Sequence, residues 1–110
     1  MPKRSWTNAL IANGTSLSGV IDLGEAQVVA IVTPAAWTAA GLAFQGSVDG
    51  TNFFSVVSSA GAEATITTAV NQCILVTQAL PRYIKVRSGT QGTPVNQGAD
   101  RLLQLALQGS

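Results

Sequence analysis

The side chains that most often carry out catalysis are scarce in this chain. Its 110 residues include no histidine, which removes the commonest general base and the commonest metal ligand. The five carboxylates are Asp22, Glu25, Asp49, Glu63 and Asp100. A glycosidase needs two carboxylates that face each other across a cleft, and nothing in this spacing predicts such a pair. No serine has a base to activate it, so we expect no enzymatic activity.

Two short segments have the composition of ligand sites. Residues 49–52 (Asp-Gly-Thr-Asn) are rich in oxygen atoms, but an EF-hand calcium loop needs a glutamate at its twelfth position, where this chain has Ala60. Residues 89–98 are rich in glycine, but they lack the lysine and the following helix of a phosphate-binding loop. We interpret the first segment as a turn. The second is a connection or contact loop, with Thr93 and Pro94 as candidate partner contacts.

Cys73 is the only cysteine, which excludes an internal disulfide and a cysteine-based metal site. Its neighbours in the sequence are apolar, and we interpret it as a small hydrophobic residue of the core. Together with the lack of histidine, this predicts a protein without a bound metal or cofactor.

One strand-like segment gathers aromatic and basic residues on a single face. Between Arg82 and Ser88, alternation places Ile84 and Val86 on one side and Tyr83, Lys85 and Arg87 on the other. The polar side is either the solvated face of a strand or a recognition surface for a carbohydrate or a protein. In the second case, aromatic stacking and charged side chains would supply specificity.

The strongest local signal is a β-hairpin over residues 42–57. An alternating strand leads into Asp49-Gly50, a dipeptide that supplies positive φ in tight turns, and a second strand follows. A continuous run of mostly β-branched residues at 28–32 predicts a central strand that ends at Pro34. Further strands are predicted at 17–23, 63–68, 72–77, 82–88 and 101–108.

These segments predict an all-β fold, a single antiparallel β-sandwich of about eight strands, of jelly-roll or galactose-binding-like type. We assign residues 17–110 to this domain. The predicted core consists of the residues on the apolar phase of each strand: Ile21, Val29, Ile31, Leu42, Phe44, Ile84, Val86, Leu103, Leu105 and Leu107.

Residues 1–16 are predicted to form an N-terminal arm, and two interpretations of it remain open. It is either a first strand that docks on the sandwich or an extended arm that reaches a neighbouring subunit through Lys3, Arg4 and Trp6. Trp37 lies in a Pro- and Ala-rich segment and has two interpretations as well. It either covers one end of the core or stacks on a ligand.

The low content of charged residues limits the classes of partner that we expect this chain to bind. Only 10% of the residues are charged, against about 25% in an average soluble domain. Much of the surface is therefore either uncharged or covered by a partner. A net charge of +1 argues against nucleic-acid binding. Polar residues interrupt the N-terminal apolar patch, and no apolar run is long enough to cross a bilayer, so we expect no signal peptide and no membrane partner.

Two stretches carry a resemblance to a known fold family. Phe44-Gln-Gly-Ser-x-Asp-Gly-Thr-x-Phe53 and Arg82-Tyr-Ile-Lys-Val-Arg87 together resemble the pattern of discoidin-type, galactose-binding-like sandwiches. The resemblance covers about half of the chain. It implies a fold rather than a ligand.

A second likeness spans more of the length. Its three stretches are Ser5-Trp-Thr-Asn-Ala-Leu-Ile-Ala-Asn-Gly14, Pro34-Ala-Ala-Trp-Thr-Ala-Ala40 and Lys85-Val-Arg-Ser-Gly-Thr-x-Gly-Thr-Pro-Val-Asn96. These resemble small virion structural proteins of tailed bacteriophages. The likeness implies a capsid decoration (cement) protein that binds the assembled shell or, alternatively, a tail or baseplate module that binds a carbohydrate or receptor.

The implied partners are other virion proteins, with the major capsid protein favoured. We also expect a homo-oligomer, a dimer or trimer. The implied location is the virion, after synthesis in the host cytoplasm.

Overall fold

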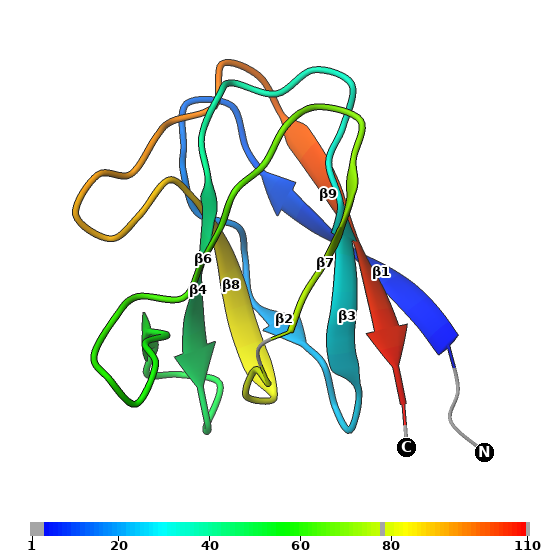
Figure 1. Ribbon diagram of the computed structural model, residues 1–110, viewed down its shortest axis with the longest axis vertical. Helices are drawn as coiled ribbons and strands as arrows, with labels where there is room; N and C mark the ends of the chain where they lie inside the picture. The colour runs from blue at the N-terminus through cyan, green and yellow to red at the C-terminus, as the bar shows by residue number, and fades with distance from the viewer. Residues whose placement is uncertain (1–3, 78, 110) are drawn as a thin grey trace.

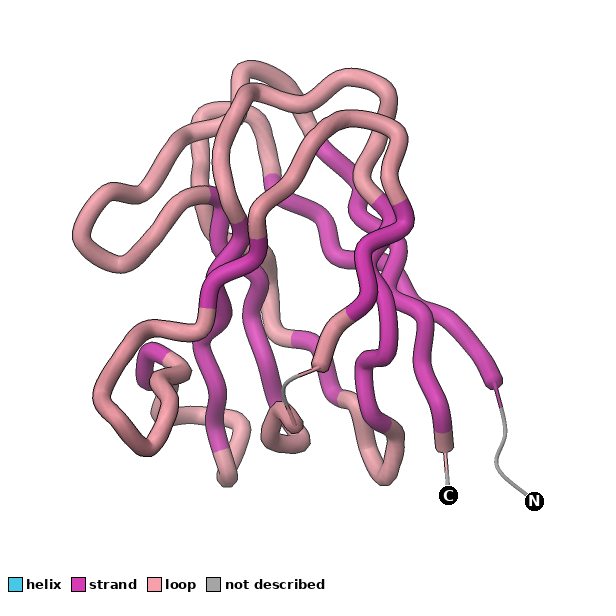
Figure 2. Tube along the Cα trace, in the orientation of Figure 1, coloured by secondary structure: helices cyan, strands magenta, loops and turns pink. Residues whose placement is uncertain are grey.

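Two antiparallel sheets packed face to face make up the protein (Figure 1). The computed structural model describes residues 4–77 and 79–109, and no helix occurs among them (Figure 2). The nine strands are β1 (Arg4–Ile11), β2 (Ile21–Asp22), β3 (Gln27–Val32), β4 (Leu42–Ser47), β5 (Phe54–Ser55), β6 (Thr65–Ile66), β7 (Cys73–Leu75), β8 (Tyr83–Ser88) and β9 (Arg101–Gln108). The predicted all-β sandwich is confirmed.

The first sheet has the strand order β1-β9-β3-β7, and the second has the order β2-β8-β4-β5, with β6 also paired to β4. The first and last of these strands are thus neighbours. β1 and β9 pair in unbroken antiparallel register over eight residues, from Arg4 opposite Gln108 to Ile11 opposite Arg101. Alternation along both strands turns one set of side chains into the sandwich and the other set to the outside.

The core lies between the two sheets, and nine of the ten predicted core residues are buried in it. Phe44, Ile31, Leu103 and Leu105 are at most 1% exposed. The prediction for Val29 is wrong. A register irregularity between Val28 and Ala30 shifts the phase of β3, so that Val28, opposite Leu107, lies in the core and Val29 is only half-buried.

Two other predictions are corrected. Cys73 is exposed rather than in the core, because β7 lies at the edge of its sheet and turns only Ile74 inward. The strand predicted at residues 17–23 shrinks to the two residues of β2, with an isolated bridge between Leu17 and Arg87. Gly19 and Val20 between them are exposed, so this segment follows β8 of the second sheet but bulges away from it instead of pairing continuously.

The hairpin prediction is confirmed, with β4 and β5 paired at Gln45–Ser55 and Gly46–Phe54. Gly50 has a φ of +79°, the left-handed value expected of a glycine in this turn.

At the other end of the sandwich, Gln97 joins three loops. It is 1% exposed, and its amide nitrogen donates to Ser88 Oγ (2.7 Å) and to the carbonyl oxygen of Thr38 (3.1 Å). Its amide oxygen accepts from the N–H of Thr38 (2.8 Å) and from Arg101 Nε (3.2 Å). Its backbone pairs with Gly14 and Thr15. A single neutral side chain therefore satisfies the buried polar groups where the loops meet.

The first prediction compares two phenylalanines of the same hairpin. Phe44 is 1% exposed and Phe54 is 70% exposed. Phe44→Ala should lower the free energy of unfolding by about 3–5 kcal/mol, because it leaves a cavity between the sheets. Phe54→Ala should change it by about 0.5 kcal/mol or less. Urea denaturation followed by fluorescence measures both, and equal losses for the two variants would contradict this description of the core.

Candidate interaction surface

The outer face of the first sheet is unusually apolar for an exposed surface. Cross-strand register places Trp6, Ala106, Ala30 and Leu75 in one row, and Asn8, Gln104, Val32 and Cys73 in the next. Leu10 and Leu102 form a third row. We call these ten residues the apolar face; Ala30 belongs to it by register but is only 5% exposed.

The apolar face carries no charge. Its only polar members are the amides Asn8 and Gln104, and the nearest charged residue on the same side of β1 is Arg4, at the end of the strand. Trp6 is 62% exposed and Leu75 is 77% exposed. Water contacts a tryptophan and several aliphatic side chains here, which is unfavourable for a free monomer and typical of an interaction site.

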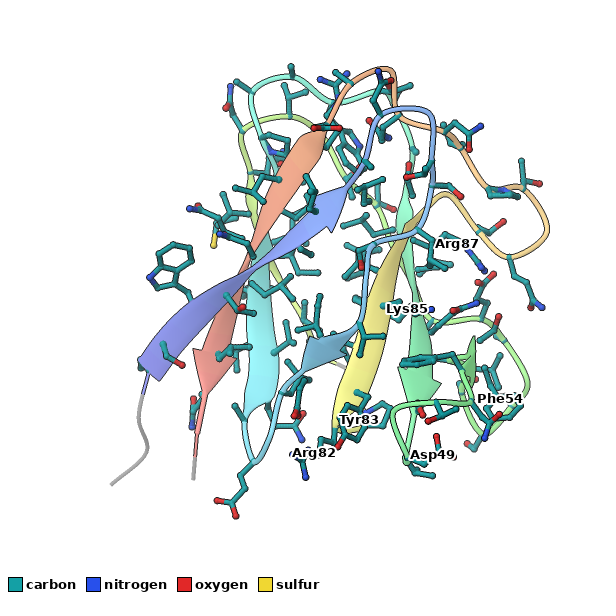
Figure 3. All side chains as sticks on the ribbon, turned by 180° about the vertical axis from the view of Figure 1, so that it is seen from behind. Asp49, Phe54, Arg82, Tyr83, Lys85 and Arg87 are labelled. Carbon is teal, nitrogen blue, oxygen red and sulfur yellow. The ribbon has the colours of Figure 1, made fainter. Side chains whose placement is uncertain are left out.

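The outer face of the second sheet is different, because its aromatic rings already have partners. Tyr83, Lys85 and Arg87 lie on one side of β8, as the alternation predicts (Figure 3). The guanidinium of Arg82 lies 4.9 Å from the centre of the Tyr83 ring, and Lys85 Nζ lies 4.6 Å from the centre of the Phe53 ring. These cation–π contacts cover surface that a stacked ligand would need.

Arg82 also binds Asp22 of β2, with 2.8 Å between its Nε and Oδ1 of the carboxylate. The hydrogen bonds that Asp22 accepts from this guanidinium hold the pKa of its carboxyl below the ordinary value, and the N–H of Gly24 adds to the effect. This ion pair joins the edge strand β2 to the start of β8. It is exposed on both sides, so it contributes little to stability.

Trp37 is half-buried and packs against the core, and its Nε1 donates to the carbonyl oxygen of Ala40 at 3.1 Å. This position agrees with the interpretation of a cover over the core. Thr93 and Pro94 are exposed in a loop closed by a bridge between Gly89 and Pro94.

The structure brings together only some of the candidate residues. Arg4 and Trp6 share the outer side of β1, whereas Tyr83, Lys85 and Arg87 share the outer side of the other sheet. Lys3 lies outside the described residues. Of the two interpretations of the N-terminal segment, residues 4–11 adopt the docked first strand.

Sequence reasoning missed the aliphatic members of the apolar face, above all Leu10, Leu75 and Leu102. A signal was present: Leu102 and Leu10 lie on the phase that the alternation of their strands assigns to solvent. Apolar residues at the solvent-facing positions of a strand indicate a contact surface.

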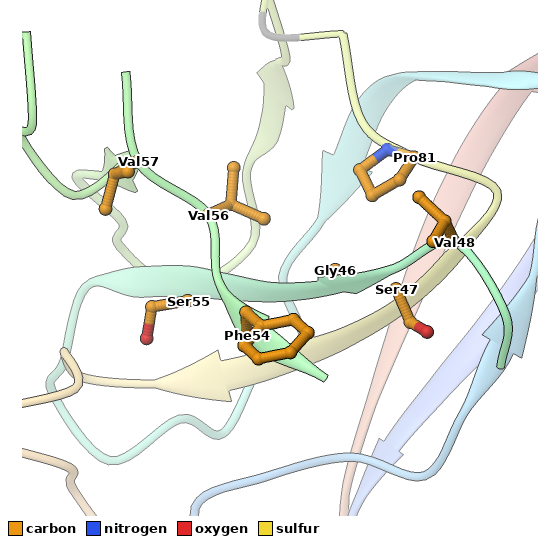
Figure 4. Close-up of a pocket in the computed structure, with 8 residues that line it drawn as sticks. All are labelled: Gly46, Ser47, Val48, Phe54, Ser55, Val56, Val57 and Pro81. Atoms are coloured by element: carbon orange, nitrogen blue, oxygen red, sulfur yellow. The ribbon is translucent and has the colours of Figure 1, made fainter. Parts of the chain in front are cut away.

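An apolar depression, separate from the apolar face, lies beside the hairpin (Figure 4). It is lined by Gly46, Val48, Phe54, Val56 and Pro81, among other residues. A side chain at Gly46 would clash with the Pro81 ring, so the glycine allows proline to approach the strand. Val48 is 90% exposed at the rim. Nothing in the surroundings identifies an occupant.

No group of three or more possible metal ligands gathers among the described residues. The described part of the chain also has no helix long and apolar enough to cross a membrane. No family model, curated protein or solved structure matches the chain.

Asp49 organises the turn of the hairpin. Its carboxylate accepts hydrogen bonds from the N–H groups of Asn52 and Thr51, from the amide of Asn52 and from Ser47 Oγ, each at 2.9 Å. These donors, led by the N–H of Asn52, hold the pKa of Asp49 well below its ordinary value of 3.8. The carboxylate oxygens of Asp49 in the oxygen-rich segment 49–52 therefore serve as hydrogen-bond acceptors within the turn itself.

The second prediction concerns pH. Because the pKa of Asp49 is lower in the folded chain than in the unfolded chain, its contribution to stability is present above the ordinary value of 3.8 and is lost as the pH falls below it. The melting temperature of the wild type should therefore fall more steeply between about pH 5 and pH 2 than that of Asp49→Asn. Thermal melts followed by circular dichroism test this. Parallel curves for the two proteins would show that the turn does not depend on the charge.

Proposed function

We propose that the chain is a non-enzymatic structural protein of a tailed-bacteriophage virion, a capsid decoration protein that binds and stabilises the assembled shell. The observation that carries the proposal is the apolar face, a charge-free surface with Trp6 near one edge. The likeness of residues 5–14, 34–40 and 85–96 to small virion proteins supports the choice of a virion over other assemblies.

Physical chemistry favours docking through this face. Few ions have to be desolvated when it is covered, and an exposed tryptophan is a common anchor of protein interfaces. The face spans four strands about 4.8 Å apart and about five residues along each strand, so its projected area is roughly 300 Å². A stable interface buries about 800 Å² on each partner. One copy therefore needs further contacts, or several copies must bind together.

Two features add the contact area that a single apolar face lacks. A homo-oligomer presents several apolar faces to the repeated sites of a shell, which raises the overall affinity without any new contact. The loop at residues 89–98, which exposes Thr93 and Pro94, offers a second contact. The favoured partner is the major capsid protein, and the place of action is the virion.

A carbohydrate-binding tail module is the alternative, and no observation favours it. Its stacking platform would need exposed aromatic rings close to one another. Trp6 lies on the outside of the first sheet, Tyr83 on the outside of the second, and Trp37 is packed against the core.

The third prediction tests the docking surface. Purified protein should co-sediment, saturably, with shells assembled from the major capsid protein of the same phage. Leu102→Glu places a charge in the apolar face and should weaken binding at least about tenfold, because that charge has to be desolvated in the contact.

Val48→Glu is the matched control, because it adds the same charge at a residue that is 90% exposed and lies away from the apolar face. It should bind like the wild type. Unchanged binding of Leu102→Glu would move the contact elsewhere, with the loop that holds Thr93 and Pro94 as the next candidate. No binding of the wild type to shells would refute the proposed function itself.

A further inference from the structure

β1 is the one long free edge among the described strands. Its eight residues pair with β9 on one side, and no described strand pairs with the other side. The remaining edge strands, β7, β2, β5 and β6, have three, two, two and two residues. Short edge strands protect a sheet from pairing with another chain, whereas a long regular edge offers a row of unpaired N–H and C=O groups. Within β1 there is neither a proline nor a register shift.

A groove runs beside this edge. It is lined by Asn8, Leu10 and Ala12 on one side and by Leu17, Gly19, Val20 and Ile21 on the other. Val20 is 51% exposed. The groove follows the open side of the sandwich, between β1 of the first sheet and the segment that leads into β2 of the second. An extended segment placed there would pair with β1 and cover Val20.

The charges on this edge suit a second copy of the same chain. Arg4 is the only charged residue of β1, and it lies at the very start of the strand. When two copies of the strand lie antiparallel, their Arg4 side chains are at opposite ends of the interface. Identical charges therefore do not meet, and the middle of the strand is neutral.

We propose that β1 pairs antiparallel with β1 of a second copy, about a two-fold axis at Asn8. Directly opposite residues share a face of the sheet, so outward residues must meet outward residues. With the axis at Asn8, Trp6 lies opposite Leu10 of the second copy and Thr7 lies opposite Ala9. An axis at Thr7 instead sets Trp6 opposite an asparagine and Arg4 opposite a leucine, which loses the apolar pairs.

The pairing joins two four-stranded sheets into one of eight strands and makes the two apolar faces continuous. Two Trp6 side chains then lie close to its centre. The interface consists of one strand ladder and its flanking side chains, at the small end of the known range, so we expect a dissociation constant on the order of 1–100 µM. The inference specifies the homo-oligomer within the proposed function, but its test contains no shell, so the two can fail separately.

The test places a charge on the proposed axis. Asn8→Lys sets two like charges directly opposite each other and should weaken dimerisation at least about tenfold. Gln104→Lys is the matched control, since Gln104 lies beside Asn8 in the same row, is exposed on the same face and belongs to an interior strand. It should dimerise like the wild type. Sedimentation equilibrium measures all three proteins, and circular dichroism checks that each is folded.

A charge swap completes the experiment. An equimolar mixture of Asn8→Lys and Asn8→Asp should recover the dimer, because opposite charges then meet at the axis. The inference is overturned if the wild type stays monomeric at 500 µM or forms a trimer. It is also overturned if Asn8→Lys dimerises as well as Gln104→Lys, or if the mixture recovers nothing.

Discussion

The structure depends above all on the pairing of its first and last strands. β1 and β9 run antiparallel without a register shift over eight residues, and this register decides which side chains are buried. It sends Ala9 and Ile11 into the core and leaves Trp6 on the outside. A slip by one residue would exchange the two sets. Among the described strands, none pairs with the other side of β1, so the core, the apolar face and the open edge all follow from this one pairing.

Sparse charge shapes the rest of the molecule. One end of the sandwich is organised by the neutral amide of Gln97, which joins the loops around Ser88 and Thr38 and also accepts from Arg101. Several of the few charged side chains are engaged within the fold: Asp49 closes its turn, and Arg82 binds Asp22. A surface built in this way has little to oppose close contact with another protein.

Alternation and turn chemistry predicted the fold class, the hairpin and most of the core. They failed where the tertiary structure breaks the local period. The irregularity in β3 that displaces Val29 has no sequence signal of its own, and Cys73 is exposed because β7 is an edge strand, a fact of topology. Topology also explains why sequence reasoning missed the apolar face. Leu102 and Leu75 are far apart in the sequence, and only the order of strands places them on one surface.

The central claim is that the first sheet is half of a larger one joined at β1. Cys73, the only cysteine, is exposed on the far strand of this sheet in the same row as Asn8. In the dimer, seven strand spacings separate its two copies, or roughly 34 Å between Cα atoms. Spin labels on Cys73, measured by double electron–electron resonance, should give one distance near this value, lengthened by the label arms. The absence of a dipolar signal in the concentrated protein, or a much shorter distance such as stacked sheets produce, would contradict the account.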